Sequence, residues 1–474
     1  MPPRKKTKAA KSSTAPTGVS GAGATVPTEL LLQIIQDAAS PPPNYTGKVN
    51  YRTRALGAMC RVNKHWHSIA RESLYRCLFF KDKPEQMAKL RRTVVNSPAI
   101  AGLIVELDIH VIGEQQLPSK ASVMAKAVAK RQKAGKDLWD VLEVLTGLQT
   151  LKIRRYLDLP KSYGADLTPT TRFTNLATVR SLEMIRCDTA IATILTQSMT
   201  SLEELSSFAT ASLKGDFHLF EGLTSHLTQL SFTWNCGRFE GNNWDDWLNV
   251  VRHSKDTLHT LELDDMDDIP PTALKSAFEL IAPSLLRLFY GTRSPELASV
   301  LLAALPTMKS LISLRTSLPA TSALALVPPT IVELGMAHQS RYYEEIQSDD
   351  AILRATLARS KDLPNLKVLW LPGTRMFFFG GEEAERHRQL EKTKEQALTE
   401  GMTWTLLTGR MGLLPRYGSE EEIMEISTEA DWIERFFSPH IPSLRLIPGV
   451  YVTRIKTGTA KVFDPVVSSR LSQK

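Results

Sequence analysis

The sequence predicts an α/β protein in which a short helical region precedes a curved solenoid of strand–turn–helix repeats, with parallel strands inside and helices outside. One observation is a six-residue apolar pattern that recurs between residues 104 and 371 at a nearly constant spacing. A second is that amphipathic helical stretches lie between its copies. A third is that further helical stretches precede the first copy, within residues 26–78. Because one such unit cannot bury its own apolar face, the units must stack on one another.

The repeating pattern consists of an apolar residue, two variable residues, a leucine, one variable residue and another apolar residue. Alternation along a strand turns the leucine and the final apolar residue to the same side, as a strand with one buried face requires. The nine starts from Leu148 to Leu366 are about 27 residues apart on average, a period typical of leucine-rich repeats. Clear copies occupy residues 104–109, 148–153, 179–184, 227–232, 258–263, 285–290, 331–336 and 366–371, and degenerate copies begin at Leu202 and Met308.

Helical stretches are predicted between these copies, so each repeat consists of a strand, a turn and a helix. We therefore expect a solenoid over residues 100–371 that resembles a divergent leucine-rich-repeat array. Residues 372–474 are expected to form a repeat remnant or a C-terminal cap, which a solenoid needs. The predicted helices are 191–199, 244–253, 272–282, 295–305 and 351–359.

In the region before the repeats, ordered structure is expected to begin at Pro27. Proline is tolerated in a first helical turn, where its missing N–H would have no partner, and Glu29 suits the positive end of the helix dipole. A second amphipathic region over residues 55–70 and a third over residues 71–78 follow. The apolar stripe of the first helix is formed by Leu30, Leu31, Ile34 and Ile35.

The order of residues in this region resembles an F-box. That family has a Leu-Pro-x-Glu-Leu-Leu start, a Val-x-Lys-x-Trp centre and a Leu-Tyr end, which match the residues that follow Val26, residues 62–66 and residues 74–75. Val26 replaces the first leucine, and the stretch 40–54 is longer than the usual joint between the first two helices. The resemblance implies a three-helix F-box over residues 26–78. With the divergent repeats, it makes the chain similar to fungal F-box proteins.

The resemblance also implies a function. Such a protein is a non-catalytic substrate receptor of a cullin-RING ubiquitin ligase, in which the F-box docks on the adaptor subunit of the cullin complex. The repeats would hold a target protein, whose identity the sequence does not give. No enzymatic activity and no cofactor are expected of the chain itself. The residues expected to form or support the adaptor-binding surface are Pro27, Leu31, Ile34, Val62 and Trp66.

Strand alternation predicts which side chains the repeats offer to a target. If the patterned leucine faces the core, the residue directly after it must face the concave surface. The residue two positions beyond that one must face the same surface. The aromatic residues among these need a cover, which is either a target or the C-terminal segment. The expected target-binding residues are Arg154, Glu262, Asp264, Phe289 and Trp370.

The net charge of +8 comes from two stretches. Residues 1–25 carry five basic side chains and residues 119–136 carry six, with no acidic residue in either. Without them, 47 basic residues face 50 acidic ones, so no broad phosphate-binding face is indicated. Residues 1–24 are predicted to be a disordered basic tail. These stretches favour one alternative function, that of a nuclear scaffold or nucleic-acid-associated binding protein, although nucleic acid is the less expected partner.

No sequence motif indicates catalysis or metal binding. The chain has no Gly-x-Ser-x-Gly, no His-Glu-x-x-His, no phosphate-binding glycine loop and no dinucleotide fingerprint. Its four cysteines are scattered and form no zinc-type cluster. No secretory signal and no apolar run long enough for a membrane span is found. We therefore expect a cytoplasmic or nuclear protein without a metal and without a membrane partner.

Overall fold

The computed structural model divides into two compact units, Met1–Leu74 and Tyr75–Lys474. The expected tail, residues 1–24, and most of the expected cap, residues 372–474, lie outside the described residues. The structure describes residues 27–39, 48–81, 84–110, 129, 133, 135–154, 173–185, 189–208, 222–233, 244–264, 267–292, 294–318, 320–336, 349–371, 389–390, 392–397, 399, 405–408 and 451–454.

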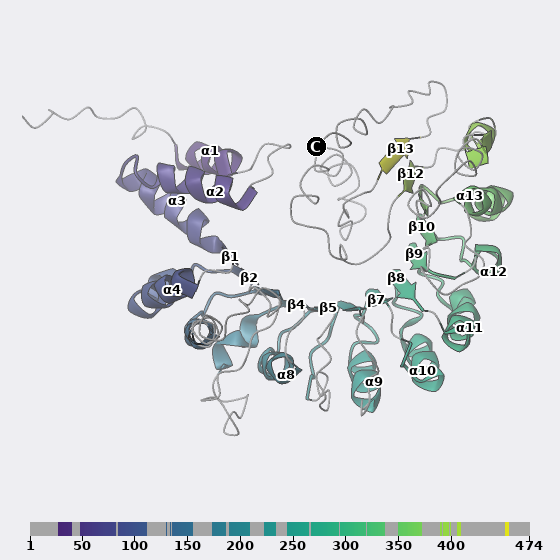
Figure 1. Cartoon of the computed structure of the whole chain (residues 1–474), viewed down its shortest axis with the longest axis horizontal. Helices are drawn as coiled ribbons and strands as arrows, with labels where there is room; N and C mark the ends of the chain where they lie inside the picture. The colour runs from purple at the N-terminus through teal and green to yellow at the C-terminus, as the bar shows by residue number, and fades with distance from the viewer. Residues whose placement is uncertain are drawn as a thin grey trace, which may run out of the picture. The chain divides into compact units, whose positions relative to one another are not determined.

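The first unit is helical and has a small core. It contains α1 (Thr28–Ala39), α2 (Lys48–Met59) and most of α3 (Lys64–Arg76) (Figure 1). Leu31 and Ile35, one turn apart on α1, form one buried cluster with Leu56 of α2 and Ala70 of α3. The partly buried side chains of Met59, Cys60, Trp66, Ile69 and Leu74 pack against this cluster. One face of α1 therefore supplies half of the buried core that holds the helices together.

The break between α2 and α3 differs from the expected helix boundaries. The apolar spacing predicts one helical region over residues 55–70, whereas the chain turns at residues 60–63 and α3 then continues to Arg76. Asn63 explains the position of the break, because its Oδ1 accepts a hydrogen bond from the Trp66 N–H at 2.9 Å. Such an N-cap satisfies one of the N–H groups that a first helical turn cannot pair internally.

The second unit is built on a sheet of thirteen strands that follow one another in sequence order. All neighbours from β1 to β12 are parallel, and β13 is antiparallel to β12. The predicted α/β array with parallel strands is therefore confirmed. The strands are β1 (Cys77–Lys81), β2 (Glu106–His110), β3 (Thr150–Arg154), β4 (Ser181–Ile185), β5 (Glu204–Phe208), β6 (Gln229–Thr233), β7 (Thr260–Asp264), β8 (Arg287–Gly291), β9 (Ser313–Thr316), β10 (Glu333–Met336), β11 (Val368–Leu371), β12 (Thr405–Thr408) and β13 (Tyr451–Arg454).

The sheet begins earlier than residue 100, where the solenoid was expected to start. β1 lies partly within the segment 26–78 and pairs with β2, with Leu78 opposite Leu107. Residues 75–80, Tyr-Arg-Cys-Leu-Phe-Phe, fit the repeating pattern with tyrosine in its first position. This copy of the repeating pattern is hard to recognise in the sequence, because the same residues also continue the apolar spacing of the preceding helix.

Helices connect many of the strands and lie on the outer side of the curve that the strands follow (Figure 1). All five predicted helices are confirmed, and the one over residues 244–253 has the predicted bounds. None of the helices in the described part of the chain has both the length and the hydrophobicity that a membrane span requires. The helices of this unit are α4 (Pro84–Asn96), α5 (Pro98–Ala101), α8 (Thr189–Ser198), α9 (Trp244–His253), α10 (Pro271–Ile281), α11 (Pro295–Ala304), α12 (Ala320–Leu324) and α13 (Asp349–Ala358), with 3₁₀ turns η4 (Thr174–Thr178), η5 (Leu305–Thr307) and η6 (Ser360–Asp362).

The patterned leucines form the centre of the core. The strand register aligns one leucine from each strand between β2 and β11, from Leu107 to Leu369, and none of these is more than 1% exposed. Each such burial stabilises the fold by about 1.5–3 kcal/mol. The residues on either side of each leucine must then face the opposite side of the sheet, which we call the inner face.

The register of β9 corrects one degenerate copy of the pattern. The copy that begins at Met308 puts Ile312 on the inner face, whereas Leu314 aligns with Leu288 of β8, so the pattern starts at Leu311. Its final position is Thr316, a polar residue that is wholly buried. A search that requires an apolar final residue therefore misses this copy. The inner-face residue of β9 is Arg315 instead of Ile312.

Gly147 is predicted to be intolerant of a side chain. A Cβ at this position would lie 2.2 Å from the backbone oxygen of Gly102, so one backbone segment would have to move. We expect Gly147→Ala to destabilise the second unit by about 1–3 kcal/mol, measured by thermal denaturation. Gly57→Ala is the control, since a Cβ there meets nothing within 4 Å and alanine favours helix α2 by about 1 kcal/mol. Equal melting temperatures for Gly147→Ala and the wild type would contradict this packing.

Candidate functional site

An exposed row of apolar side chains lies on helix α1 of the first unit. Leu30 and Ile34, four residues apart, are 55% and 42% exposed, and Pro27, which immediately precedes the helix, is exposed as well. Steps of three and four residues place all three on one side of the helix. Exposed apolar side chains that lie side by side are more informative than single ones, because a contiguous apolar patch is typical of an interaction site.

A further exposed apolar side chain, Val62 at 57%, lies in the turn between α2 and α3. Hydrogen bonds hold this turn on both sides. The Val62 N–H donates to the Met59 carbonyl at 3.1 Å, and the Arg61 N–H donates to Ala58 at 3.0 Å. His67 Nδ1 lies 2.9 Å from the Cys60 carbonyl oxygen, which can only accept a hydrogen bond from it. Val62 is therefore presented on an ordered turn.

The five predicted adaptor-binding residues fall into two groups. Pro27, Ile34 and Val62 are exposed and can contact a partner. Leu31 is wholly buried and can only support the surface, whereas Trp66 is partly buried against the small core. Leu30, which precedes Leu31 and belongs to the predicted stripe, is exposed. We use the name docking surface for Pro27, Leu30 and Ile34 of the row on α1 together with Val62 of the turn between α2 and α3.

The inner face of the second unit carries polar and charged side chains along most of its length. Hydrogen bonds between neighbouring strands connect several of them. Lys152 Nζ of β3 lies 2.6 Å from Glu106 Oε1 of β2, and the Ser231 hydroxyl of β6 donates to Glu262 Oε2 of β7 at 2.7 Å. The residues that follow the patterned leucines are Asp108, Lys152, Glu183, Ser206, Ser231, Glu262, Phe289, Arg315, Gly335 and Trp370.

The structure places four of the five predicted target-binding residues on this face. Glu262, Phe289 and Trp370 occupy the same position in the register of β7, β8 and β11. Asp264 lies two residues beyond Glu262, opposite Gly291, and a Cβ on that glycine would be 2.2 Å from the Asp264 carboxylate. Arg154 ends β3, and its side chain lies outside the described residues.

The two aromatic residues are not open to solvent. Phe289 is 7% exposed and Trp370 is 1% exposed, and neither belongs to the main core cluster. The Arg315 side chain covers part of Trp370, since its guanidinium carbon lies 4.4 Å from the centre of the indole ring. Trp370 therefore belongs to the chain's own packing, and its role in target binding stays a prediction, as does that of Phe289.

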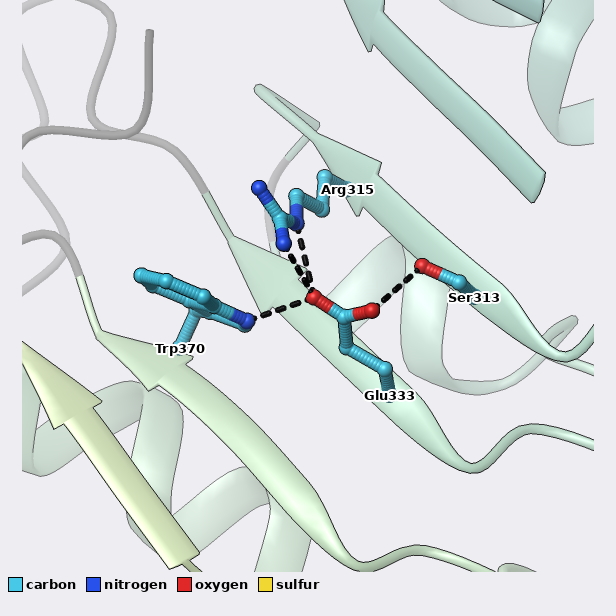
Figure 2. A network of polar contacts seen from close by, with 4 residues as sticks. All are labelled: Ser313, Arg315, Glu333 and Trp370. Atoms are coloured by element: carbon cyan, nitrogen blue, oxygen red, sulfur yellow. Dashed lines mark hydrogen bonds and ion pairs between the residues drawn. The ribbon is translucent and has the colours of Figure 1, made fainter. Parts of the chain in front are cut away.

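A buried carboxylate organises this end of the inner face. Figure 2 shows that the bonds of three side chains converge on Glu333 of β10, which is 1% exposed. Arg315 donates from Nε to Oε1 at 2.8 Å and also from Nη2, Trp370 Nε1 donates to Oε1 at 2.6 Å, and the Ser313 hydroxyl donates to Oε2 at 2.8 Å. We call these four residues the Glu333 cluster.

Gly335 makes the geometry of the cluster possible. The register places it between Arg315 of β9 and Trp370 of β11. Since neighbouring strands lie about 4.8 Å apart, the two side chains span two strand spacings. No side chain rises from Gly335 between them, so the guanidinium can stack on the indole.

Sequence reasoning missed Glu333 and Arg315. Arg315 was hidden by the three-residue error in the register of β9. Glu333 comes immediately before the patterned leucine, a position that faces the inner side as surely as the position after it. Reading both flanking positions of each leucine would have found it.

Asp267, in the turn that follows β7, has polar partners within the chain. Asp267 Oδ1 accepts a hydrogen bond from the Thr292 hydroxyl at 2.7 Å and one from the Ser294 N–H at 3.3 Å. Nearby Tyr290 is fully buried, and burial raises the pKa of its hydroxyl. Among the residues that the structure describes, no three His, Cys, Asp or Glu side chains form a group that could hold a metal ion.

No known protein-family model matches the chain, and no curated protein matches its sequence. Its function must therefore be inferred from the docking surface of the first unit and from the inner face of the second.

Proposed function

We propose that the chain is a non-catalytic substrate receptor of a cullin-RING ubiquitin ligase. The observation that carries the proposal is the docking surface of the first unit, in which the residues that resemble an F-box present exposed apolar side chains on a small helical unit. In this proposal the surface binds the adaptor subunit, and the adaptor links the chain to the cullin.

The core of the first unit supports this role. Four wholly buried side chains hold its helices, while Leu30, Ile34 and Val62 are between 42% and 57% exposed. Burying apolar area contributes about 25 cal/mol per Å², so a partner that covers these side chains gains directly from that contact. An apolar helix face that fits a groove of a partner is a common mode of recognition.

The second unit supplies the target site in this proposal. Its inner face extends over many strands and offers hydrogen-bonding and charged groups at the strand spacing, which suits an extended segment of a partner protein. The receptor itself breaks no bond. It raises the effective concentration of a target lysine near a ubiquitin-loaded enzyme carried by another subunit.

Affinity purification of the tagged full chain from its native cells tests this function. We expect the adaptor and a cullin to be recovered together with the chain, and we expect recovery to be insensitive to nuclease. Recovery of nucleic acid and chromatin proteins without adaptor or cullin would contradict the proposal.

A further inference from the structure

Arg287 is a second arginine on the inner face, and its situation differs from that of Arg315. It is the first residue of β8, and the register places it between Thr260 of β7 and Ser313 of β9. It precedes the patterned Leu288, so it faces the same side as Phe289, the other residue that flanks this leucine. Arg287 and Arg315 thus lie on one face of adjacent strands.

The side chain of Arg287 is partly buried, and the described residues include no hydrogen-bond or ion-pair partner for it. Its Nε is buried without an acceptor, and the side chain takes part in none of the hydrogen bonds or ion pairs found in the described ranges. Arg315, by contrast, donates twice to Glu333. A guanidinium carries five donors, and a polar group that is buried without a partner calls for an explanation.

The neighbouring carboxylates do not supply that explanation. Glu333 and Glu262 are close enough to act on Arg287 electrostatically, yet burial outweighs them and lowers the pKa of its guanidinium. Glu333 already accepts bonds from Arg315, Ser313 and Trp370, and Glu262 accepts one from Ser231. An arginine stays protonated at neutral pH in any case, so Arg287 is a cation with unused donors.

We propose that Arg287 binds a carboxylate of the target protein, at the part of the inner face formed by β7, β8 and β9. This inference rests on the proposed function, because it names the chemistry of the segment that the receptor holds. A guanidinium matches a carboxylate in shape and can donate two parallel hydrogen bonds to it.

The local charge favours a carboxylate over a phosphate. Arg287 and Arg315 carry two positive charges, and Glu262, Asp264 and Glu333 carry three negative ones, so this part of the face has a net charge of −1. One bound carboxylate adds a single negative charge there, whereas a phosphate brings nearly two negative charges close to the three carboxylates. The carboxylate belongs to an aspartate or glutamate side chain or to the C-terminus of the target.

The melting temperatures of two matched variants test whether Arg287 contributes to the stability of the fold. Arg287→Met should leave the melting temperature of the full chain unchanged or raise it, because it removes a desolvated charge without a partner. Arg315→Met, on the adjacent strand and the same face, should lower it by several degrees, because it leaves the carboxylate of Glu333 without its cation. If Arg287→Met lowers the melting temperature as much as Arg315→Met, Arg287 is a structural residue and the proposal fails.

Selection from a peptide library tests the ligand. The probe is a library of random twelve-residue peptides, displayed once with a free C-terminus and once with the C-terminus blocked, and the bait is the full chain. We expect enrichment of Asp and Glu at one position, or of the free terminus, by about tenfold or more. Arg287→Lys should keep part of this preference, and Arg287→Met should lose it.

Two results would overturn the carboxylate site: no acidic preference in the wild type, or the same preference in Arg287→Met. A parallel library with a central phosphoserine provides a third contradicting result, which is enrichment of phosphoserine without enrichment of Asp, Glu or the free C-terminus. Recovery of the adaptor is measured separately with the same proteins. Wild-type chain that fails to bind the adaptor but keeps the acidic preference contradicts the ligase function and leaves the carboxylate site in place.

Discussion

Replacing Glu333 by alanine should destabilise the second unit by about 3 kcal/mol, the largest stability loss that we expect from a single change on the inner face. The carboxylate is 1% exposed and accepts bonds from Arg315, Trp370 and Ser313. Its removal leaves a largely buried guanidinium and a buried indole N–H without their acceptor, and such losses cost far more than an exposed ion pair contributes. Urea denaturation followed by tryptophan fluorescence measures the change.

Glu204→Ala is the matched control for this prediction. Glu204 occupies the same register position on β5, but it is exposed and accepts one bond, from the Ser181 hydroxyl at 2.9 Å. Its loss should change stability by about 0.5 kcal/mol or less. Similar losses for the two variants would show that the Glu333 cluster does not hold this part of the sheet together.

The double variant Ile34→Asp, Val62→Asp should reduce adaptor recovery about a hundredfold or more. Both side chains are exposed, so the first unit can fold with aspartate at these positions, whereas an interface cannot desolvate two unpaired carboxylates without a large cost. Quantitative pull-down of the adaptor by the tagged full chain measures the effect. Leu31 is not a suitable site for this test, because its wholly buried side chain belongs to the core and an aspartate there would unfold the unit.

Leu32→Asp provides the control. Leu32 lies on the same helix and is 41% exposed, but it is two residues from both Leu30 and Ile34 and so points to a different side of α1. Adaptor recovery with Leu32→Asp should equal that of the wild type. Equal loss in both variants, or no loss in the double variant, would show that the docking surface is misassigned.

Much of the repeat architecture was predictable from the sequence, because strand alternation and leucine spacing are local properties. The helix over residues 244–253 was predicted with its observed bounds, and Leu202 correctly marked the copy that forms β5. The failures also have local causes. Thr316 fills a buried position where the pattern requires an apolar residue. Asn63 caps α3 in the middle of the apolar spacing that predicted one helical region over residues 55–70.

The candidate sites were less predictable. Alternation correctly turned Glu262, Phe289 and Trp370 to one face, but the burial of Phe289 and Trp370 depends on tertiary contacts that the spacing does not specify. The Glu333 cluster joins three strands at one carboxylate, and no local motif predicts such a contact. On α1 the spacing identified the apolar stripe but not which half of it faces the core, since that depends on where α2 and α3 pack.

Binding of the purified full chain to the purified adaptor subunit is the most direct test of the proposed function. Isothermal titration calorimetry should detect a one-to-one complex with a Kd of about 1 μM or tighter, and Ile34→Asp, Val62→Asp should abolish the heat of binding. The docking surface would then be the contact that joins the chain to the ligase. No measurable heat with the wild-type chain at concentrations near 100 μM would contradict the account.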